Sequence, residues 1–100
     1  MMLLTQAIRR AFPAWMSTDG QGDAAKIVVK FFTPDSNWTW YATEFDGEDT
    51  FFGLVRGHET ELGYFTLSEL QSARGPLRMT IERDLHFGAH TIGDARERAI

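Results

Sequence analysis

The segment that decides the fold reads WTWYATEF (38–45), DGED (46–49), TFFGLVR (50–56), GHET (57–60) and ELGYF (61–65). Aromatic and β-branched residues fill its three apolar stretches, as is typical of β-strands. Short polar links separate these stretches, and Asp-Gly in the first link is a strong hairpin signal. Because links this short join antiparallel neighbours, the segment predicts an antiparallel meander.

The preceding residues, 26–32, extend the meander by one strand. They alternate in a way that places Ile27, Val29 and Phe31 on one face. A turn over residues 33–37 follows, where a proline fixes φ and Asp and Asn cap the backbone.

Beyond the meander, the sequence predicts a helix and one more strand. Thr66 and Glu69 match a capping box, in which Thr66 caps a helix over residues 67–73 and Glu69 reaches back. Gly75 suits the left-handed conformation that ends many helices. Residues 80–87 alternate again and predict a fifth strand.

Both ends of the chain predict helices. An apolar stripe runs through residues 3–16, although Pro13 disfavours helix at the residue before it. Residues 17–24 predict a loop, and residues 91–100, within a C-terminal tail of 88–100, predict a short helix. The stripe consists of Leu4, Ile8, Phe12 and Trp15.

Together these elements predict one α+β domain over residues 1–100: an antiparallel β-meander of four to five strands with two or three short helices. The N-terminal helix and the Thr66-capped helix should pack on one face of the sheet. The predicted core residues are Ile27, Val29, Phe31, Phe52, Leu54, Leu67, Leu70, Ile81 and Leu85.

Composition excludes several classes of protein. The chain has no Cys, so it holds no disulfide and no thiolate nucleophile or metal ligand. No apolar stretch approaches the roughly 20 residues that span a bilayer. Arg9 and Arg10 interrupt the N-terminal apolar residues, which is unlike a signal peptide. We therefore expect a cytoplasmic protein without a membrane partner.

Charge is unevenly distributed around a net value of −4. Residues 31–71 contain eight acids and a single base, Arg56, whereas both ends are mildly basic. An acidic surface repels nucleic-acid phosphates and attracts basic protein grooves. We therefore expect no direct binding to nucleic acid.

Several blocks of the sequence resemble domain-of-unknown-function family 2958 over about residues 26–87. The blocks are VKFFTP (29–34), WTW (38–40), FGLV (52–55), ELGYF (61–65), RGPL (74–77) and IERDLHF (81–87). Residues 78–80 depart from the family pattern, in which a second Gly and a Pro often precede the last block. The resemblance implies a small bacterial protein often encoded on mobile elements, and it carries over no catalytic residue.

One group of side chains could support chemistry. Glu82, Asp84 and His86 alternate with other residues, so an extended strand would present all three on one face, and His58 and Glu59 could complete a metal or acid-base site. The alternative is a solvated strand face, which we favour because no His-Glu-x-x-His motif is present. We therefore predict no metal and no cofactor.

Other enzyme signals are absent from the sequence. His86 and His90 have ligand spacing only on a helix, and Gly88 lies between them after a predicted strand. No phosphate-binding glycine loop and no Gly-x-Ser-x-Gly elbow occurs. We therefore predict no catalytic residue and a protein that is not an enzyme.

Two sets of residues are candidates for binding a protein partner. The first set is aromatic: Trp38 and Trp40 share one strand face and Tyr41 lies on the other. The alternative role of these three residues is packing in the core and the hairpin. Acidic residues gather near the turns, where the alternative is ordinary solvation. They are Glu44, Asp46, Glu48, Asp49, Glu59 and Glu61.

These features predict a small acidic interaction protein. Our first hypothesis is a mobile-element inhibitor of a host defence that targets nucleic acid, of the anti-CRISPR or anti-restriction type, which occupies a basic groove. The first alternative is an accessory protein-binding module of plasmid transfer or replication. The second alternative is a small metal-dependent enzyme using Glu82, Asp84 and His86. The sequence leaves the oligomeric state open.

Overall fold

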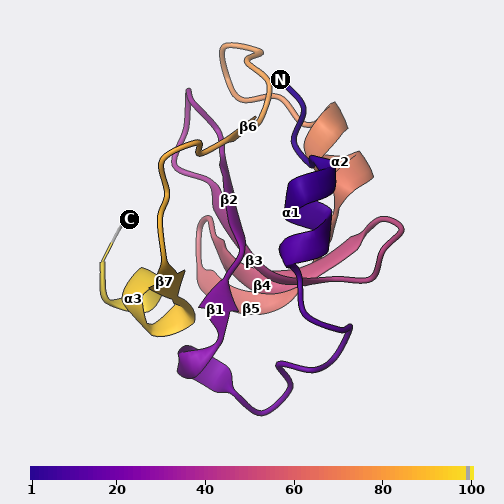
Figure 1. Ribbon diagram of the computed structural model, residues 1–100. Coiled ribbons are helices and arrows are strands. Elements are labelled where there is room, and N and C mark those ends of the chain that lie inside the picture. Colours follow the sequence, from indigo (N-terminus) through magenta and orange to yellow (C-terminus); the bar gives the residue numbers. More distant parts are fainter. Residues whose placement is uncertain (99) are drawn as a thin grey trace.

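The structure is a computed structural model that describes residues 1–98 and 100. A five-stranded antiparallel sheet forms its centre, with the strand order β5-β4-β3-β2-β6 (Figure 1). The predicted α+β class and the antiparallel meander are confirmed. The strands are β2 (Val29–Phe32), β3 (Thr39–Phe45), β4 (Thr50–Arg56), β5 (Thr60–Thr66) and β6 (Glu82–Arg83).

The smaller elements cover the two faces of this sheet. Helices α1 and α2 pack on one face, while β1, β7 and α3 lie on the other (Figure 1). β1 and β7 pair with each other as a second, two-stranded sheet. The elements are α1 (Gln6–Ala11), η1 (Gly22–Ala24, a 3-10 helix), β1 (Lys26–Ile27), α2 (Leu67–Ser72), β7 (His90–Thr91) and α3 (Ile92–Glu97).

The β3–β4 turn forms as its Asp-Gly sequence predicts. The Asp46 carboxylate accepts hydrogen bonds from the backbone N–H groups of Glu48, Asp49 and Thr50 at 2.8–3.1 Å. Gly47 has a φ of 90°, which other residues rarely adopt. One carboxylate and one glycine therefore define this hairpin.

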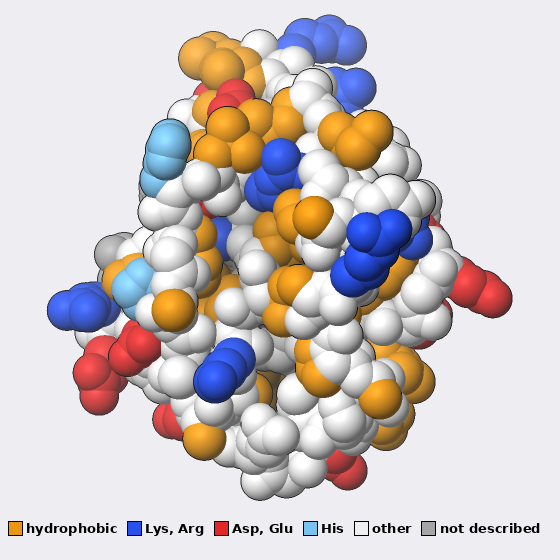
Figure 2. All heavy atoms as spheres, viewed as in Figure 1, with side chains coloured by type: hydrophobic (Ala, Val, Ile, Leu, Met, Phe, Trp, Pro, Cys, Tyr) orange, Lys and Arg blue, Asp and Glu red, His pale blue; other side chains and the backbone are white. Residues whose placement is uncertain are grey.

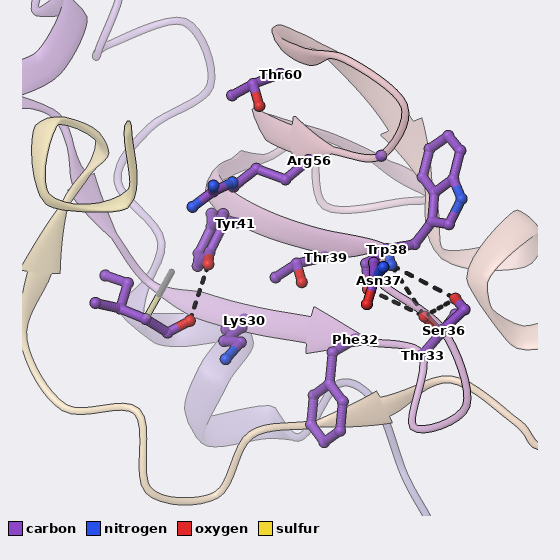
Figure 3. A pocket seen from close by; sticks show the side chains of 12 residues that line it. Lys30, Phe32, Thr33, Ser36, Asn37, Trp38, Thr39, Tyr41, Arg56 and Thr60 are labelled. Atoms are coloured by element: carbon purple, nitrogen blue, oxygen red, sulfur yellow. Dashed lines mark hydrogen bonds between the residues drawn. The ribbon is translucent and has the colours of Figure 1, made fainter. Parts of the chain in front are cut away.

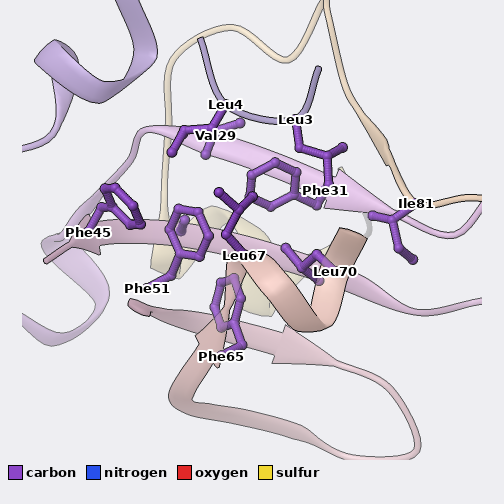
Figure 4. Close-up of a cluster of buried hydrophobic side chains, with 11 residues drawn as sticks. Leu3, Leu4, Val29, Phe31, Phe45, Phe51, Phe65, Leu67, Leu70 and Ile81 are labelled. Atoms are coloured by element: carbon purple, nitrogen blue, oxygen red, sulfur yellow. The ribbon is translucent and has the colours of Figure 1, made fainter. Parts of the chain in front are cut away.

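The first core lies between the large sheet and helices α1 and α2 (Figure 4). Phe51 of β4 is fully buried at its centre. Its ring centroid lies 4.7 Å from that of Phe45, 5.3 Å from that of Phe65 and 5.5 Å from that of Phe31. Aromatic pairs of this kind stabilise a core beyond their buried area. The buried members are Leu3, Leu4, Val29, Phe31, Ala42, Phe45, Phe51, Phe65, Leu67, Leu70 and Ile81.

A second core lies on the opposite face, under β1 and α3. Its buried members are Ala25, Ile27, Tyr41, Leu54, Ile92 and Ala95. The predicted single strand over 26–32 is wrong, because the Val28 N–H donates to the Ala42 carbonyl (2.8 Å) between β1 and β2. Ile27 consequently belongs to the second core, whereas Val29 and Phe31 belong to the first.

The N-terminal helix is shorter than the predicted 3–16. It begins after Thr5, whose hydroxyl accepts the Ile8 N–H at 3.2 Å, and its last helical residue is Ala11. Phe12 is extended, as the proline after it favours. Leu3 and Leu4 reach the first core from outside the helix.

Two of the predicted core residues are wrong. Phe52 is only half-buried, because β4 turns the neighbouring Phe51 toward the first core. Leu85 is 60% exposed, since the strand predicted over 80–87 pairs only at Glu82–Arg83. Ile81, the other predicted core residue of that segment, is buried.

The helix caps follow the sequence in part. The Thr66 hydroxyl accepts the Glu69 N–H (3.1 Å) as predicted, while the Glu69 carboxylate accepts from that hydroxyl (2.9 Å). The helix predicted over 91–100 ends at Glu97; residue 99, which that prediction included, lies outside the described residues.

Gly75 does not adopt the left-handed conformation that we predicted for it. It lies against the Asp35 carboxylate instead, where a Cβ atom would come within 1.6 Å of Oδ1. Arg78 has the positive φ, at 65°. The Leu77 N–H donates to Asp35 Oδ2 (2.7 Å), so this carboxylate orders the loop after α2.

Candidate functional site

The acidic residue Glu44 serves the fold. It is 2% exposed, and its carboxylate accepts hydrogen bonds from the Thr18 N–H (3.0 Å), the Thr18 hydroxyl and the Met16 N–H. The bulge in β3 between Ala42 and Glu44 turns this side chain toward the N-terminal loop. Glu44 therefore adds nothing to an exposed acidic surface.

Two further acids hold local structure at the β3–β4 turn. The three backbone N–H groups described above lower the pKa of Asp46. The Asp49 carboxylate accepts from the Ser68 N–H (2.9 Å) and from the Ser68 hydroxyl (2.7 Å), which ties the turn to α2. Only Glu48 of this turn is exposed without such a contact in the part of the chain that the structure describes.

Glu59 and Glu61 lie at the other end of β4, in and after the turn that leads into β5. A hydrogen bond with Glu59 and repulsion from its charge raise the pKa of Glu61. The predicted acids thus form two groups at opposite ends of one strand. Figure 2 agrees for the face it shows, where acidic side chains lie scattered near the margin.

The aromatic residues divide between the two faces as predicted. The rings of Trp38 and Trp40 stack with centroids 6.0 Å apart, and Trp40 packs against the first core. Trp38 is 36% exposed at the rim, where its ring and the His58 ring are nearly perpendicular, with centroids 5.6 Å apart. Tyr41 is buried on the opposite face and donates to the Ile100 carbonyl at 2.9 Å.

The structure does not arrange Glu82, Asp84 and His86 as a set of metal ligands. The Asp84 carboxylate pairs with Lys30 Nζ at 3.6 Å, and its other oxygen accepts the His86 N–H at 2.9 Å. Among residues 1–98 and 100, no group of three His, Asp or Glu side chains is arranged to hold a metal. His90 pairs with Asp94 at 3.7 Å instead.

Sequence reasoning missed the free edge of β5. The Leu67 N–H donates to the Asp49 carbonyl (2.8 Å), and the Gly57 N–H donates to the Glu59 carbonyl (2.9 Å). Hydrogen-bonded pairs alternate along an antiparallel ladder. With the observed register, the bonded pairs between these two are Phe51–Phe65, Gly53–Gly63 and Val55–Glu61.

The other residues of β5 therefore turn their backbone groups away from β4. These are Thr60, Leu62, Tyr64 and Thr66, and no further strand pairs with them in the described part of the chain. Leu62 is 39% exposed and Tyr64 62% exposed. The Trp15 ring lies 6.2 Å from the Tyr64 ring, so an apolar surface follows the open edge.

A hollow of about 530 Å³ lies over the other end of the second face (Figure 3). Its floor is a row of directly opposed residues across four strands: Phe32, Thr39, Arg56 and Thr60. The next row adds Lys30 and Tyr41. Residues far apart in sequence thus share this floor, which explains why sequence patterns missed it.

The fold and these surfaces define a small α+β protein with an open strand edge and a cationic hollow. The chain belongs to the family described as "Protein of unknown function (DUF2958)", whose model matches residues 3–94. This confirms the resemblance and extends it beyond the predicted 26–87. No curated protein and no solved structure matches the chain. Among the described residues, every helix is too short or too polar to cross a membrane.

Proposed function

We propose that this chain is a non-enzymatic interaction protein that binds an extended segment of a protein partner along β5. The observation that carries the proposal is the open edge, where outward backbone groups alternate along seven residues. An added strand would pair with Thr60, Leu62 and Tyr64. The exposed side chains of Leu62 and Tyr64 would select apolar residues of that strand.

Charge favours a basic partner. Glu59 and Glu61 stand at the start of this edge, and a hydrogen bond between them together with their mutual repulsion raises the pKa of Glu61. A Lys or Arg of the partner would relieve this repulsion. A second copy of the chain would add further carboxylates, so we favour a different protein whose extended segment carries basic residues.

The inhibitor hypothesis names the partner more specifically, as a host defence complex that targets nucleic acid. A defence complex that targets nucleic acid has a basic groove for its substrate, and such a groove fits the charge of the β5 edge. The net charge of −4 and the mobile-element association implied by the family resemblance support this role.

An accessory module of plasmid transfer or replication is the second candidate. The exposed Trp38 at the rim of the sheet favours it, since exposed aromatic residues often anchor protein interfaces. In that case Trp38→Ala should weaken partner binding more than neutralisation of Glu59 and Glu61 does.

The test compares two substitutions at one position. Leu62→Pro removes an outward N–H and the apolar side chain, whereas the control Leu62→Ala removes only the side chain. Partners captured from nuclease-treated host extract would be identified at moderate and high salt, and their affinities measured. We expect Leu62→Pro to bind about tenfold more weakly than Leu62→Ala, a difference of about 1.4 kcal/mol.

Hydrogen exchange provides an independent measurement. Bound partner should slow exchange of the Leu62 and Tyr64 amides, because both N–H groups would enter a new ladder. Equal affinity of the two Leu62 variants together with unchanged exchange would contradict the proposal. Cleavage assays on the identified partner, if it is a nuclease complex, then test inhibition directly.

A further inference from the structure

We propose that the hollow beside α3 binds a small organic anion, one that joins a phosphate or carboxylate group to a planar ring. This site shares Thr60 with the outer edge of β5, but it lies on the face of the sheet and does not depend on the function proposed at that edge. The evidence is the charge of the hollow, its unused polar groups, and its size and walls.

The hollow gathers positive charge within an acidic protein. Arg56 is the one base between residues 31 and 71. Its Nη1 donates to the Ala95 carbonyl at 2.8 Å, which orients the guanidinium and leaves its charge in place. Among the residues that the structure describes, no carboxylate side chain lies within ion-pair distance of Arg56. A planar guanidinium held in this way suits an oxyanion.

Lys30 adds a second cation from the next row of the floor. Its side chain is mostly buried, and its Nζ lies 3.6 Å from the Asp84 carboxylate and 5.6 Å from the centre of the Phe32 ring. Asp84 neutralises the charge of Lys30, so among the side chains that line the hollow the charge of Arg56 stays unpaired. This balance fits a ligand with one or two negative charges.

Uncharged polar groups complete the lining. The side chains of Asn37, Thr39 and Thr60 make no hydrogen bond within the described part of the chain, so they are free to bind a ligand. Burial raises the pKa of Tyr41, whereas the Arg56 charge opposes this shift. Tyr41 therefore stays neutral at physiological pH and does not repel an anion. Figure 3 shows the Arg56 side chain extending toward Tyr41.

Size and shape limit the class of ligand. A volume of about 530 Å³ falls within the roughly 300–1,000 Å³ typical of small-molecule pockets. Phe32 lines the hollow on the same face as Arg56 and offers aromatic surface to a planar ring, while Trp38 lies at the rim with its ring stacked on Trp40. Gly57 leaves space for the Trp38 ring, because a Cβ atom there would come within 2.3 Å of it.

Titrations followed by NMR would test this site. The probes are 5′-AMP and benzoate, with inorganic phosphate to test the anion alone and adenosine to test the ring alone. We expect saturable shifts of the Arg56 Nε–H and Thr39 backbone N–H signals with AMP or benzoate, and none with adenosine. Arg56→Gln should weaken binding about tenfold, whereas the control Arg10→Gln, on α1 across the sheet, should leave it unchanged.

Three results would overturn the proposal or part of it. No saturable shift with any anion would reject the site, as would equal binding by Arg56→Gln and the native protein. Phosphate binding as tightly as AMP would reject the planar ring. If Arg56→Gln fails to fold, Lys30→Met against the control Lys26→Met provides the same comparison, since these are the two lysines of the chain.

Discussion

The two edges of the large sheet are built in opposite ways. At one edge, β6 is two residues long and charged, and the Arg83 side chain donates to the Met2 carbonyl at 2.8 Å. At the other edge, β5 runs for seven residues and carries the exposed Leu62 and Tyr64. Proteins protect edges with short strands and charge. Among the residues that the structure describes, one edge is protected and the other is open, and this contrast supports our proposal that a partner binds along β5.

The contrast between interior and edge is sharpest at one cross-strand pair. Gly53 of β4 and Gly63 of β5 lie directly opposite each other. A Cβ atom on Gly53 would come within 1.8 Å of the Tyr41 carbonyl oxygen, whereas a Cβ atom on Gly63 would meet no other group within 4 Å. The same residue type thus has a packing role at one position and none at the other.

The largest expected effect is that of Gly53→Ala. The added methyl group would overlap the backbone of β3, so we expect the free energy of unfolding to fall by about 3 kcal/mol. Urea denaturation would measure it. Gly63→Ala is the matched control and should change stability by less than about 1 kcal/mol. Similar losses in both variants would show that the edge is as constrained as the interior.

A smaller difference in stability should separate two proline substitutions in β5, Gly63→Pro and Leu62→Pro. Gly63→Pro removes an N–H that bonds to β4 and leaves its acceptor unpaired, so we expect a loss of about 2–4 kcal/mol. Leu62→Pro removes an N–H that faces solvent and should cost less than half as much. Thermal unfolding of both variants measures the difference. If Leu62→Pro cost more than Gly63→Pro, the Leu62 N–H and not the Gly63 N–H would be the one that bonds to β4.

The smallest effects concern pH at the two ends of β4. The lowered pKa of Asp46 contributes stability that is present above pH 3.8 and is lost as the pH falls through the folded-state pKa. The raised pKa of Glu61 contributes stability that is present below pH 4.5 and is lost as the pH rises through the folded-state pKa.

Melting temperatures between pH 2 and 7 would separate these two groups. Asp46→Asn should lower stability at neutral pH and reduce the loss on acidification. Glu61→Gln should remove the decrease above pH 4.5 and leave the acid limb unchanged. If Glu61→Gln has no effect on the profile above pH 4.5, the two carboxyl groups at the β5 edge do not repel each other in solution.

Local sequence predicted the elements whose signals are local. The Asp46 turn, β4 and the Thr66 cap form as predicted, because each depends on residues within a few positions. Prediction failed where residues distant in sequence determine which side chains are buried and which strands pair. Periodicity alone could not show that β4 presents Phe51 rather than Phe52 to the first core. It also could not show that residues 80–87 pair at only two positions.

The candidate sites were predicted less well for the same reason. Trp38 and Tyr41 fall on opposite faces as expected, since strand alternation is local. Glu44 was indistinguishable from an exposed acid, because the N–H groups that bury it come from residues 16 and 18. The β5 edge left a weak signal in the apolar side chains of Leu62 and Tyr64.

The sequence by itself determined the α+β class, the hairpin order and the family, because hydrophobic alternation, turn residues and family blocks are properties of short segments. Tertiary structure alone decided which strand became an open edge and which side chains met in the hollow. Lys30, Tyr41 and Arg56 come together through the register of β2, β3 and β4. That register depends on how two cores pack on opposite faces of one sheet, which no single segment encodes.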